Sequence, residues 1–357
     1  MGVGRRTVSL SPLAATAQAL VGRDRGLLAM DESTSTCNRR FAASGIAPTE
    51  AARRAYRELL VTAPGLGMHV SGAILYDETI RQSDLNGTRF VDLLVAAGVI
   101  PGIKVDVGAK DLALHRGEKV TEGLDGLRAR LKDYATMGAR FAKWRAVIAI
   151  GDGLPSLACI GANAHALARY AAMCQEAGLV PIVEPEVLME GRHTILRCGE
   201  VTHAVLRAVF DALDVQGVVL EAMVLKPNMV LPGLDCPEQP PADAVAQATL
   251  ACLRQTVPAA VAGIAFLSGG QSADLASARL NAVNLEHETA ADRSPWPLVF
   301  SFGRALQQPA LQIWRGQEAN VLAAQGALIH RANCNAAAVR GLYTPSMEHG
   351  PALQLAS

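Results

Sequence analysis

The segment Glu221-Ala222-Met223-Val224-Leu225-Lys226-Pro227-Asn228-Met229 places one lysine at the end of an apolar run and directly before a proline. An apolar run that starts after Gly217 and stops at Pro227 is typical of a strand buried on both faces. Because proline cannot donate to a sheet ladder, Lys226 marks the end of the strand. Such a lysine either extends its amine along an apolar stem to solvent or holds a desolvated amine. In the second case its pKa falls, and the free amine can attack a carbonyl group.

Composition narrows the class of protein. The chain has 357 residues, enough for two domains or for one α/β barrel. Half of the residues are hydrophobic and 18% are charged, so a large core can form. Lys plus Arg and Asp plus Glu both total 33, which argues against the basic excess of a nucleic-acid-binding protein. No uncharged apolar run approaches ~20 residues, so we expect no membrane-spanning helix.

Cysteine and histidine spacing argues against a metal site. The seven cysteines are scattered, and neither a CxxC pair nor an HxxxH or HxH pair occurs. Reduced, buried thiols in a cytoplasmic protein are the simplest interpretation. Arg5-Arg6 superficially resembles the start of an export signal, but the alanine-rich stretch after it leads into a strand at Leu27. We therefore expect a cytoplasmic protein without a targeting segment.

Short apolar runs alternate with longer helical stretches along the whole chain. The predicted strands are Leu27–Asp31, Val70–Tyr76, Ile100–Asp106, Phe141–Ile148, Leu179–Val187, Val218–Lys226, Ala262–Leu267 and Leu298–Phe302. The predicted helices include Pro48–Thr62, Gly123–Thr136, Asn163–Gln175, Val201–Leu213, Ala242–Gln255 and Ala273–Val283. Eight strand–helix units predict a single (β/α)8 TIM barrel, one domain over residues 1–357 with 344–357 as a C-terminal tail. The competing fold, a doubly wound open sheet, would favour a Gly-x-Gly-x-x-Gly motif after the first strand, which is missing.

The charged residues of interest lie on the predicted strands, and all but Lys143 fall in their C-terminal halves. They are Asp31, Lys104, Asp106, Lys143, Arg145, Glu184, Glu186 and Lys226. The active site of a TIM barrel is built at the C-terminal ends of its strands, so this distribution favours an active site. Four acids and four bases can be buried together where a lone charge could not. The alternative is a purely structural ion network that fills the top of the barrel.

The last two predicted strands lead into glycine-containing loops. The seventh runs into Ser268-Gly269-Gly270-Gln271-Ser272, and the eighth runs into Gly303-Arg304. Glycine lets backbone N–H groups approach an anion, and the helix that follows each loop adds favourable partial charge. Loops after strands 7 and 8 of a barrel frequently bind phosphate. A desolvated lysine, carboxylates and a phosphate loop together indicate imine chemistry on a phosphorylated ketose, with Glu184 or Glu186 as the acid and base.

Several segments together resemble one family. They are Leu28-Ala29-Met30-Asp31-Glu32-Ser33-Thr34, Pro101-Gly102-Ile103-Lys104-Val105-Asp106, Phe141-Ala142-Lys143-Trp144-Arg145, Val183-Glu184-Pro185-Glu186, Leu225-Lys226-Pro227-Asn228-Met229, Leu267-Ser268-Gly269-Gly270-Gln271-Ser272 and Ser301-Phe302-Gly303-Arg304-Ala305-Leu306-Gln307. In this order they are similar to the motifs of class I fructose-bisphosphate aldolases, and the similarity runs from about Leu13 to Ser346.

The resemblance implies a cytoplasmic homotetramer without metal or cofactor. Such an enzyme cleaves fructose 1,6-bisphosphate, a phosphorylated ketose, to two triose phosphates in glycolysis and gluconeogenesis. By the same resemblance Lys226 forms the Schiff base, Glu184 is the general acid and base, and Asp31 and Lys143 assist carbinolamine formation and carbon–carbon cleavage. The residues expected to bind the ketose-end phosphate are Arg40, Ser268, Gly269, Gly270, Ser301, Gly303 and Arg304. The residues expected toward the other phosphate are Ser33, Thr36, Lys104 and Arg145, with Glu186 and Asp106 in support.

The chain also departs from the family pattern. Animal members end in a tyrosine that assists proton transfer, whereas the last tyrosine here is Tyr343. The segment Asn284–Trp296 is about four residues longer than usual, which predicts a surface loop. Two rival functions remain at this point: another Schiff-base lyase or transferase such as a transaldolase, and a binding protein that kept the fold without the chemistry.

Overall fold

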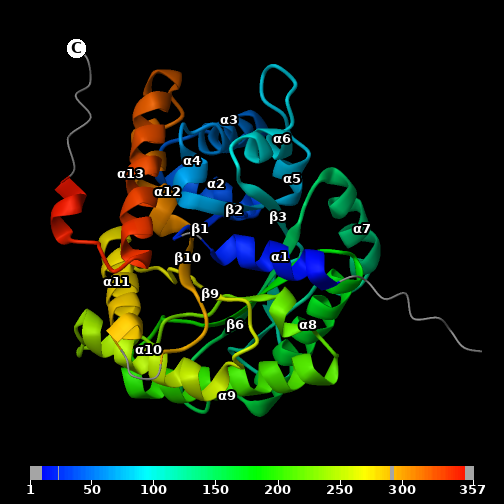
Figure 1. Ribbon diagram of the computed structural model, residues 1–357, viewed down its shortest axis with the longest axis vertical. Helices are drawn as coiled ribbons and strands as arrows, with labels where there is room; N and C mark the ends of the chain where they lie inside the picture. Colours follow the sequence, from blue (N-terminus) through cyan, green and yellow to red (C-terminus); the bar gives the residue numbers. More distant parts are fainter. Residues whose placement is uncertain (1–9, 23, 290–292, 350–357) are drawn as a thin grey trace, which may run out of the picture.

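A computed structural model describes residues 10–22, 24–289 and 293–349. Eight parallel strands close into a barrel in the order β1-β10-β9-β8-β7-β6-β3-β2 (Figure 1). Pairing of β1 with β10, with Leu27 opposite Ser301, completes the ring. The barrel strands are β1 Gly26–Ala29, β2 Val70–Leu75, β3 Ile100–Lys104, β6 Phe141–Ile148, β7 Val180–Val187, β8 Val224–Leu225, β9 Ile264–Phe266 and β10 Leu298–Phe302. The predicted (β/α)8 TIM barrel is therefore confirmed.

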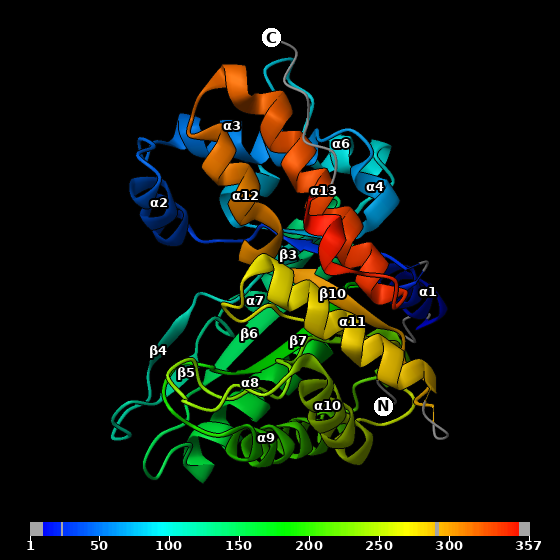
Figure 2. The same cartoon turned by 90° about the vertical axis from the view of Figure 1, so that its left-hand side faces the viewer.

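Helices surround the barrel on all sides (Figures 1 and 2). They are α1 Leu10–Val21, α2 Thr34–Ala43, α3 Glu50–Val61, α4 Leu66–His69, α5 Asp77–Ile80, α6 Phe90–Ala96, α7 Leu127–Met137, α8 Leu157–Glu176, α9 Ile195–Val215, α10 Ala242–Thr256, α11 Ala273–Thr289, α12 Arg304–Trp314 and α13 Val321–Val339. Short 3-10 helices occupy η1 Leu220–Ala222, η2 Glu318–Asn320 and η3 Pro345–His349, and a hairpin is formed by β4 Ala109–Asp111 and β5 Lys119–Thr121. Each predicted helix is present, with ends shifted by a few residues.

Helix α1 closes the N-terminal end of the barrel. Its Leu13, Ala17 and Leu20 are buried and share one apolar cluster with inward-facing strand residues such as Leu27 and Phe141. Ser71, near the start of β2, donates to the backbone oxygen of Leu20 at 2.5 Å and so holds the helix against the strands. A second, larger apolar core lies between the strands and the outer helices. With one end sealed, the polar residues at the opposite end of the strands form the open mouth.

The predicted strand over Val218–Lys226 is wrong in its first half. Only Val224–Leu225 pairs as β8, and residues 220–222 form η1. The reason is the side chain of Gln175 in α8, whose Nε2 donates to the oxygens of Val219 and Ala222 at 2.8 and 3.3 Å. Its Oε1 accepts from the Val219 nitrogen at 3.0 Å, so backbone groups that a sheet would pair are already satisfied. Lys226 remains on the barrel, because its nitrogen donates to Val183 O at 2.8 Å.

The predicted surface loop at Asn284–Trp296 is wrong in its first part, whereas residues 293–296 are irregular as expected. Helix α11 continues to Thr289, and the side chains of Asn284 and His287 are buried. Trp296 is buried too and donates to Pro258 O at 2.9 Å. Residues 290–292 lie outside the described ranges, as do Arg5-Arg6 and the end of the tail from residue 350.

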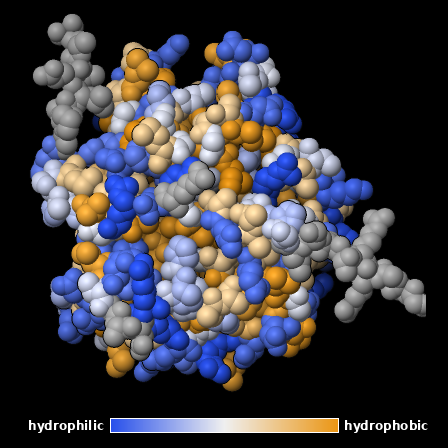
Figure 3. Space-filling view, viewed as in Figure 1, coloured by the Kyte–Doolittle hydropathy of each residue, from blue (hydrophilic) through white to orange (hydrophobic). Residues whose placement is uncertain are grey.

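No helix within the described ranges is both long and apolar enough to cross a membrane. Hydrophilic and hydrophobic residues are intermingled over the face shown in Figure 3.

Candidate active site

A cavity of about 1250 Å³ opens at the C-terminal end of the barrel. Asp31 follows β1, Lys143 lies on β6, Glu184 on β7, and Lys226 directly follows β8. Residues two apart on a strand point to the same side, which is why Lys143 and Arg145 both line the cavity while Trp144 is buried on the other side. The amine of Lys226 and these acids therefore meet in one cavity. The amine is buried and does not extend into solvent.

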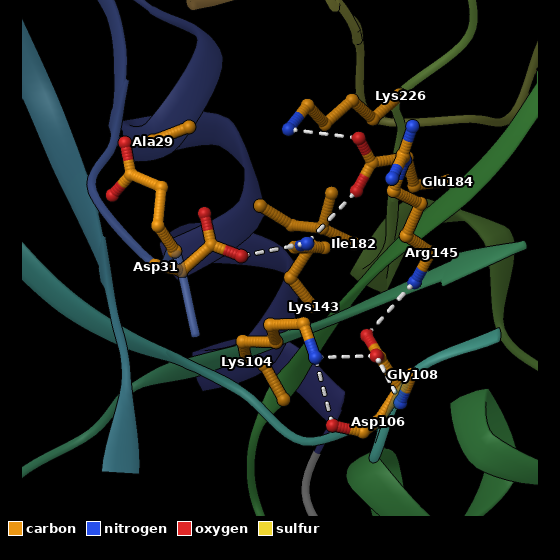
Figure 4. A network of polar contacts seen from close by, with 12 residues as sticks. Ala29, Asp31, Lys104, Asp106, Gly108, Lys143, Arg145, Ile182, Glu184 and Lys226 are labelled. Atoms are coloured by element: carbon orange, nitrogen blue, oxygen red, sulfur yellow. Dashed lines mark hydrogen bonds and ion pairs between the residues drawn. The ribbon is translucent and has the colours of Figure 1, made fainter. Parts of the chain in front are cut away.

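Lys226, Glu184, Lys143 and Asp31 form a continuous chain of ion pairs (Figure 4). Glu184 Oε1 lies 3.1 Å from Lys226 Nζ, and its Oε2 lies 3.2 Å from Lys143 Nζ. Lys143 Nζ in turn lies 2.7 Å from Asp31 Oδ2. The side chains of both lysines and of Glu184 are only 4% exposed, so these charges act on one another with little screening by water.

The pKa values in this chain follow from the alternation of charge. Burial alone would raise the pKa of Asp31, but the ammonium charges of Lys143 and Lys226 outweigh it and lower that pKa to about 2. The pKa of Glu184 is lowered in the same way: burial opposes ionisation, and Lys143 and Lys226 overcome it. Burial would lower the pKa of Lys143, yet Asp31 and Glu184 raise it above the ordinary value. At neutral pH Glu184 is therefore a carboxylate held between two amines.

A second set of charged residues lies toward the mouth of the cavity. Asp106 accepts from Lys104 Nζ, from the nitrogen of Gly108 at 3.1 Å and from the nitrogen of Arg145 at 3.2 Å. Burial would lower the pKa of Arg145, but the paired carboxylate of Glu186 outweighs this effect and raises that pKa. Lys104 and Arg145 are thereby held at the cavity wall. Glu186 pairs with Arg145, whereas Glu184 is the carboxylate that faces Lys226.

The two glycine-containing loops lie on another side of the cavity. Gly269 and Gly270 have φ values of 60° and 100°, a region that favours glycine, and a Cβ at Gly269 would lie 3.2 Å from Met189 Sδ. Ser268, Gly269, Ser301, Gly303 and Arg304 line the cavity, whereas Gly270 does not. Ser301 Oγ is buried and has no hydrogen-bond partner.

Arg304 begins helix α12 and is exposed. Its Nη2 lies beside Gly270, 3.4 Å from where a Cβ would be. Within the described ranges its guanidinium makes no ion pair or hydrogen bond. An unpaired guanidinium, a free buried hydroxyl and the N-terminus of an eleven-residue helix together suit an anion.

Helix α2 contributes the remaining predicted residues. Arg40 lines the cavity, but its guanidinium already pairs with Glu32 and donates to Gln307 Oε1 at 3.3 Å. Ser33 caps the helix by accepting from the nitrogen of Thr36 at 3.4 Å. Both also line the cavity.

The same cavity holds residues that the sequence did not reveal. Arg39 lines it and donates to Thr36 Oγ1 at 3.2 Å, and Glu32 lines it while bound to Arg57 at 2.8 Å. The adjacent arginines Arg39 and Arg40 near the end of α2 were the sequence signal that could have identified Arg39. The pairing of Glu32, in the loop after β1, with Arg57 on α3 joins segments 25 positions apart and had no local signal.

One group in the described part of the chain could ligate a metal ion. It consists of His330 and Cys334 on α13 and Glu348 in η3, whose ligand atoms lie within 4.8 Å of one another. Glu348 is already bound to Arg331 and accepts from Tyr343 Oη at 2.7 Å. None of these residues lines the barrel cavity, so a metal there would take no part in chemistry at Lys226.

Comparisons with known proteins show the family of the chain. The family model described as fructose-bisphosphate aldolase class-I matches residues 12–355. The "Probable fructose-bisphosphate aldolase class 1" of Xanthomonas axonopodis pv. citri is 55% identical over 335 residues, covering 94% of this chain and 99% of that protein. The "Fructose-bisphosphate aldolase, cytoplasmic isozyme" of Cicer arietinum is 51% identical over 327 residues, or 91% and 90% of the two chains.

A solved structure shows the same barrel. Plasmodium falciparum fructose-bisphosphate aldolase, crystallised in a ternary complex with TRAP and a small-molecule inhibitor, superposes with a TM-score of 0.91 at 46% identity. The match covers 94% of this chain and 95% of that one. A match of this extent in both sequence and fold shows that the protein belongs to the class-I fructose-bisphosphate aldolase family.

Proposed function

We propose that the protein reversibly cleaves fructose 1,6-bisphosphate to glyceraldehyde 3-phosphate and dihydroxyacetone phosphate through an imine on Lys226. Membership of the family supports the reaction, and the 3.1 Å pair of Lys226 with Glu184 carries the assignment of the residues. An ammonium cannot attack a ketone, so Lys226 first transfers a proton to the facing carboxylate. The resulting free amine and carboxylic acid are the two groups that imine formation needs.

Imine formation then uses both partners of the pair. The amine adds to the ketone carbon at C2, and a proton passes from the new ammonium nitrogen to the oxygen to give a carbinolamine. The acid form of Glu184 protonates the departing hydroxyl, water leaves, and a protonated imine remains. The same carboxylate can next accept the proton of the C4 hydroxyl. The C3–C4 bond then breaks, its electron pair flows toward the iminium nitrogen, and the aldehyde departs.

Lys143 and Asp31 support these steps electrostatically. Lys143 stays protonated, because its acidic neighbours raise its pKa, and it lies 3.2 Å from Glu184 Oε2. Its positive charge stabilises the oxygen that gains negative charge while the proton moves. Asp31, held ionised, fixes the position of Lys143 at 2.7 Å.

The substrate phosphates need cations at opposite sides of this chain. The free guanidinium of Arg304 and the Ser268–Gly270 loop suit the ketose-end phosphate. Ser301 and Gly303 border the same region, and Arg40 lies beside it, already paired with Glu32. Lys104 and Arg145 lie toward the other phosphate, with Asp106 and Glu186 holding them and Ser33 and Thr36 near the entrance.

A coupled assay with fructose 1,6-bisphosphate tests the function. We expect turnover without any added acceptor aldehyde and without loss in EDTA, and we expect Lys226→Met to be inactive. Glu184→Gln should lower kcat by ~10²–10⁴-fold, the usual effect of removing a general acid or base. Turnover that required an acceptor aldehyde would indicate a transaldolase-type transferase. Absence of turnover would indicate a binding protein, and activity in Lys226→Met would refute the imine.

We also propose that the protein is a cytoplasmic homotetramer. The name of the Cicer arietinum relative, a cytoplasmic isozyme, supports the compartment, and the tetramer rests on the resemblance to the family alone. Light scattering on the purified protein tests the tetramer, and a monomer in solution would contradict it. We further propose that residues 1–357 form one domain, with 344–357 as a tail. Limited proteolysis should remove the tail and leave the barrel intact.

A further inference from the structure

Arg279 on helix α11 is a buried cation that lacks an acidic partner. Arg279 is 4% exposed, and its guanidinium forms no ion pair within the described ranges. The other buried lysines and arginines there each pair with a carboxylate; they are Arg53, Arg57, Lys143, Lys226 and Arg331. Burial lowers the pKa of Arg279, and no nearby acid offsets this effect. A lone buried charge costs free energy, so its presence calls for a reason.

The side chain of Arg279 reaches the loop after β9. Its Nη1 donates to Gln271 Oε1 at 3.1 Å, while its own Nε and the Nε2 of Gln271 are buried without partners. Gln271 closes the tight turn of that loop, because its nitrogen donates to Ser268 O at 3.0 Å. Ser268 and Gly269 line the main cavity, whereas Gln271 lines a small cavity on another side of the loop. Arg279 thus contacts the loop through Gln271, which does not line the main cavity.

The loop itself is suited to an anion. It carries two glycines with positive φ, it lies beside the free guanidinium of Arg304, and it leads into the seventeen-residue helix α11. A phosphate there would bring negative charge to a region where the described residues place positive charge without a counter-ion. In the absence of substrate, the charge of Arg279 is therefore unbalanced, and phosphate binding would balance it.

We propose that Arg279 is a positioning residue for the ketose-end phosphate, holding the Ser268–Gln271 turn through Gln271 and contributing a positive charge that the bound phosphate compensates. This inference rests on the proposed aldolase function and adds a residue to it. It also accounts for a buried cation that would otherwise only destabilise the fold.

The test compares Arg279→Met with the wild type in steady-state kinetics and thermal unfolding. Fructose 1,6-bisphosphate and fructose 1-phosphate share the ketose-end phosphate, so KM should rise about tenfold for both, with kcat within about twofold. The unfolding midpoint without substrate should not fall, because a lone buried charge has been removed. Arg279→Lys, which keeps the charge, should recover part of the lost affinity.

Arg53→Met is the matched control, since Arg53 is buried but pairs with Glu78 at 2.7 Å, outside the cavity lining. It should lower the unfolding midpoint and leave KM unchanged. An unchanged KM in Arg279→Met would overturn the inference, as would a rise confined to the bisphosphate. If the wild type itself fails to cleave either substrate, the proposed function fails as well, so the two failures are distinguishable.

Discussion

Replacing Asp31 with asparagine removes one charge from the buried chain and keeps the shape of the side chain. In the wild type Asp31 Oδ2 lies 2.7 Å from Lys143 Nζ, and the two lysines lower the pKa of Asp31 from 3.8 to about 2. A difference of nearly two pKa units corresponds to about 2 kcal/mol of stability. The side chain of Asp31 is only 12% exposed, so solvent screening removes little of this value.

The sign of the pH dependence follows from the direction of the shift. The folded-state pKa of Asp31 lies below the unfolded value, so the stabilisation is fully present above about pH 5 and is lost as the pH falls through about 2. The wild type should exceed Asp31→Asn by about 2 kcal/mol in free energy of unfolding near neutral pH, and by roughly half of that at about pH 3. Activity should fall too, because Lys143 loses the contact that positions it.

Urea unfolding of both proteins across this pH range measures the difference. Equal stability near neutral pH would refute the assigned role of the Asp31–Lys143 pair. A difference that stayed constant down to about pH 3 would show that the effect of the substitution is steric and does not depend on the charge of Asp31.

Two further predictions concern the phosphate region and the fold. Arg304→Ala should raise KM for phosphorylated ketoses by at least about tenfold with little change in kcat, because a guanidinium without a protein partner serves mainly binding; a large fall in kcat at unchanged KM would contradict this. Gln175→Leu should lower the free energy of unfolding by about 2–3 kcal/mol, because it removes the hydrogen-bond partner of the Val219 nitrogen and the Ala222 oxygen and one of the two partners of the Val219 oxygen. Calorimetry measures the second effect. A variant as stable as the wild type would show that the conformation of residues 218–223, which lead into β8, does not depend on Gln175.

The barrel and the ion-paired residues at its mouth could be predicted because their sequence signals are local. Charged residues inside apolar runs mark the strands that line the cavity, so Lys143 and Glu184 could be placed on neighbouring strands before their contacts were known. The same logic succeeded for Asp31, although the strand itself stops at Ala29. A few residues of error at strand ends do not move a side chain to another region of the barrel.

The remaining features depend on contacts between distant segments. Residues 218–223 are as apolar as a strand, and only the side chain of Gln175, more than forty positions away, diverts them into a 3-10 helix. The lone charge of Arg279 likewise looks like an ordinary surface arginine until helix α11 is seen to bury it behind the phosphate loop. The local sequence pattern predicts which side chains reach the cavity, and tertiary packing decides which residues they pair with.

The most direct test of the imine is borohydride reduction in the presence of dihydroxyacetone phosphate, followed by peptide mass mapping. We predict inactivation with one triose-phosphate adduct per chain, located on the peptide that contains Lys226. Lys143 lies in the same cavity and pairs with the same carboxylate, so it serves as an internal control. An adduct on Lys143, or full activity after reduction with no adduct at all, would contradict the account.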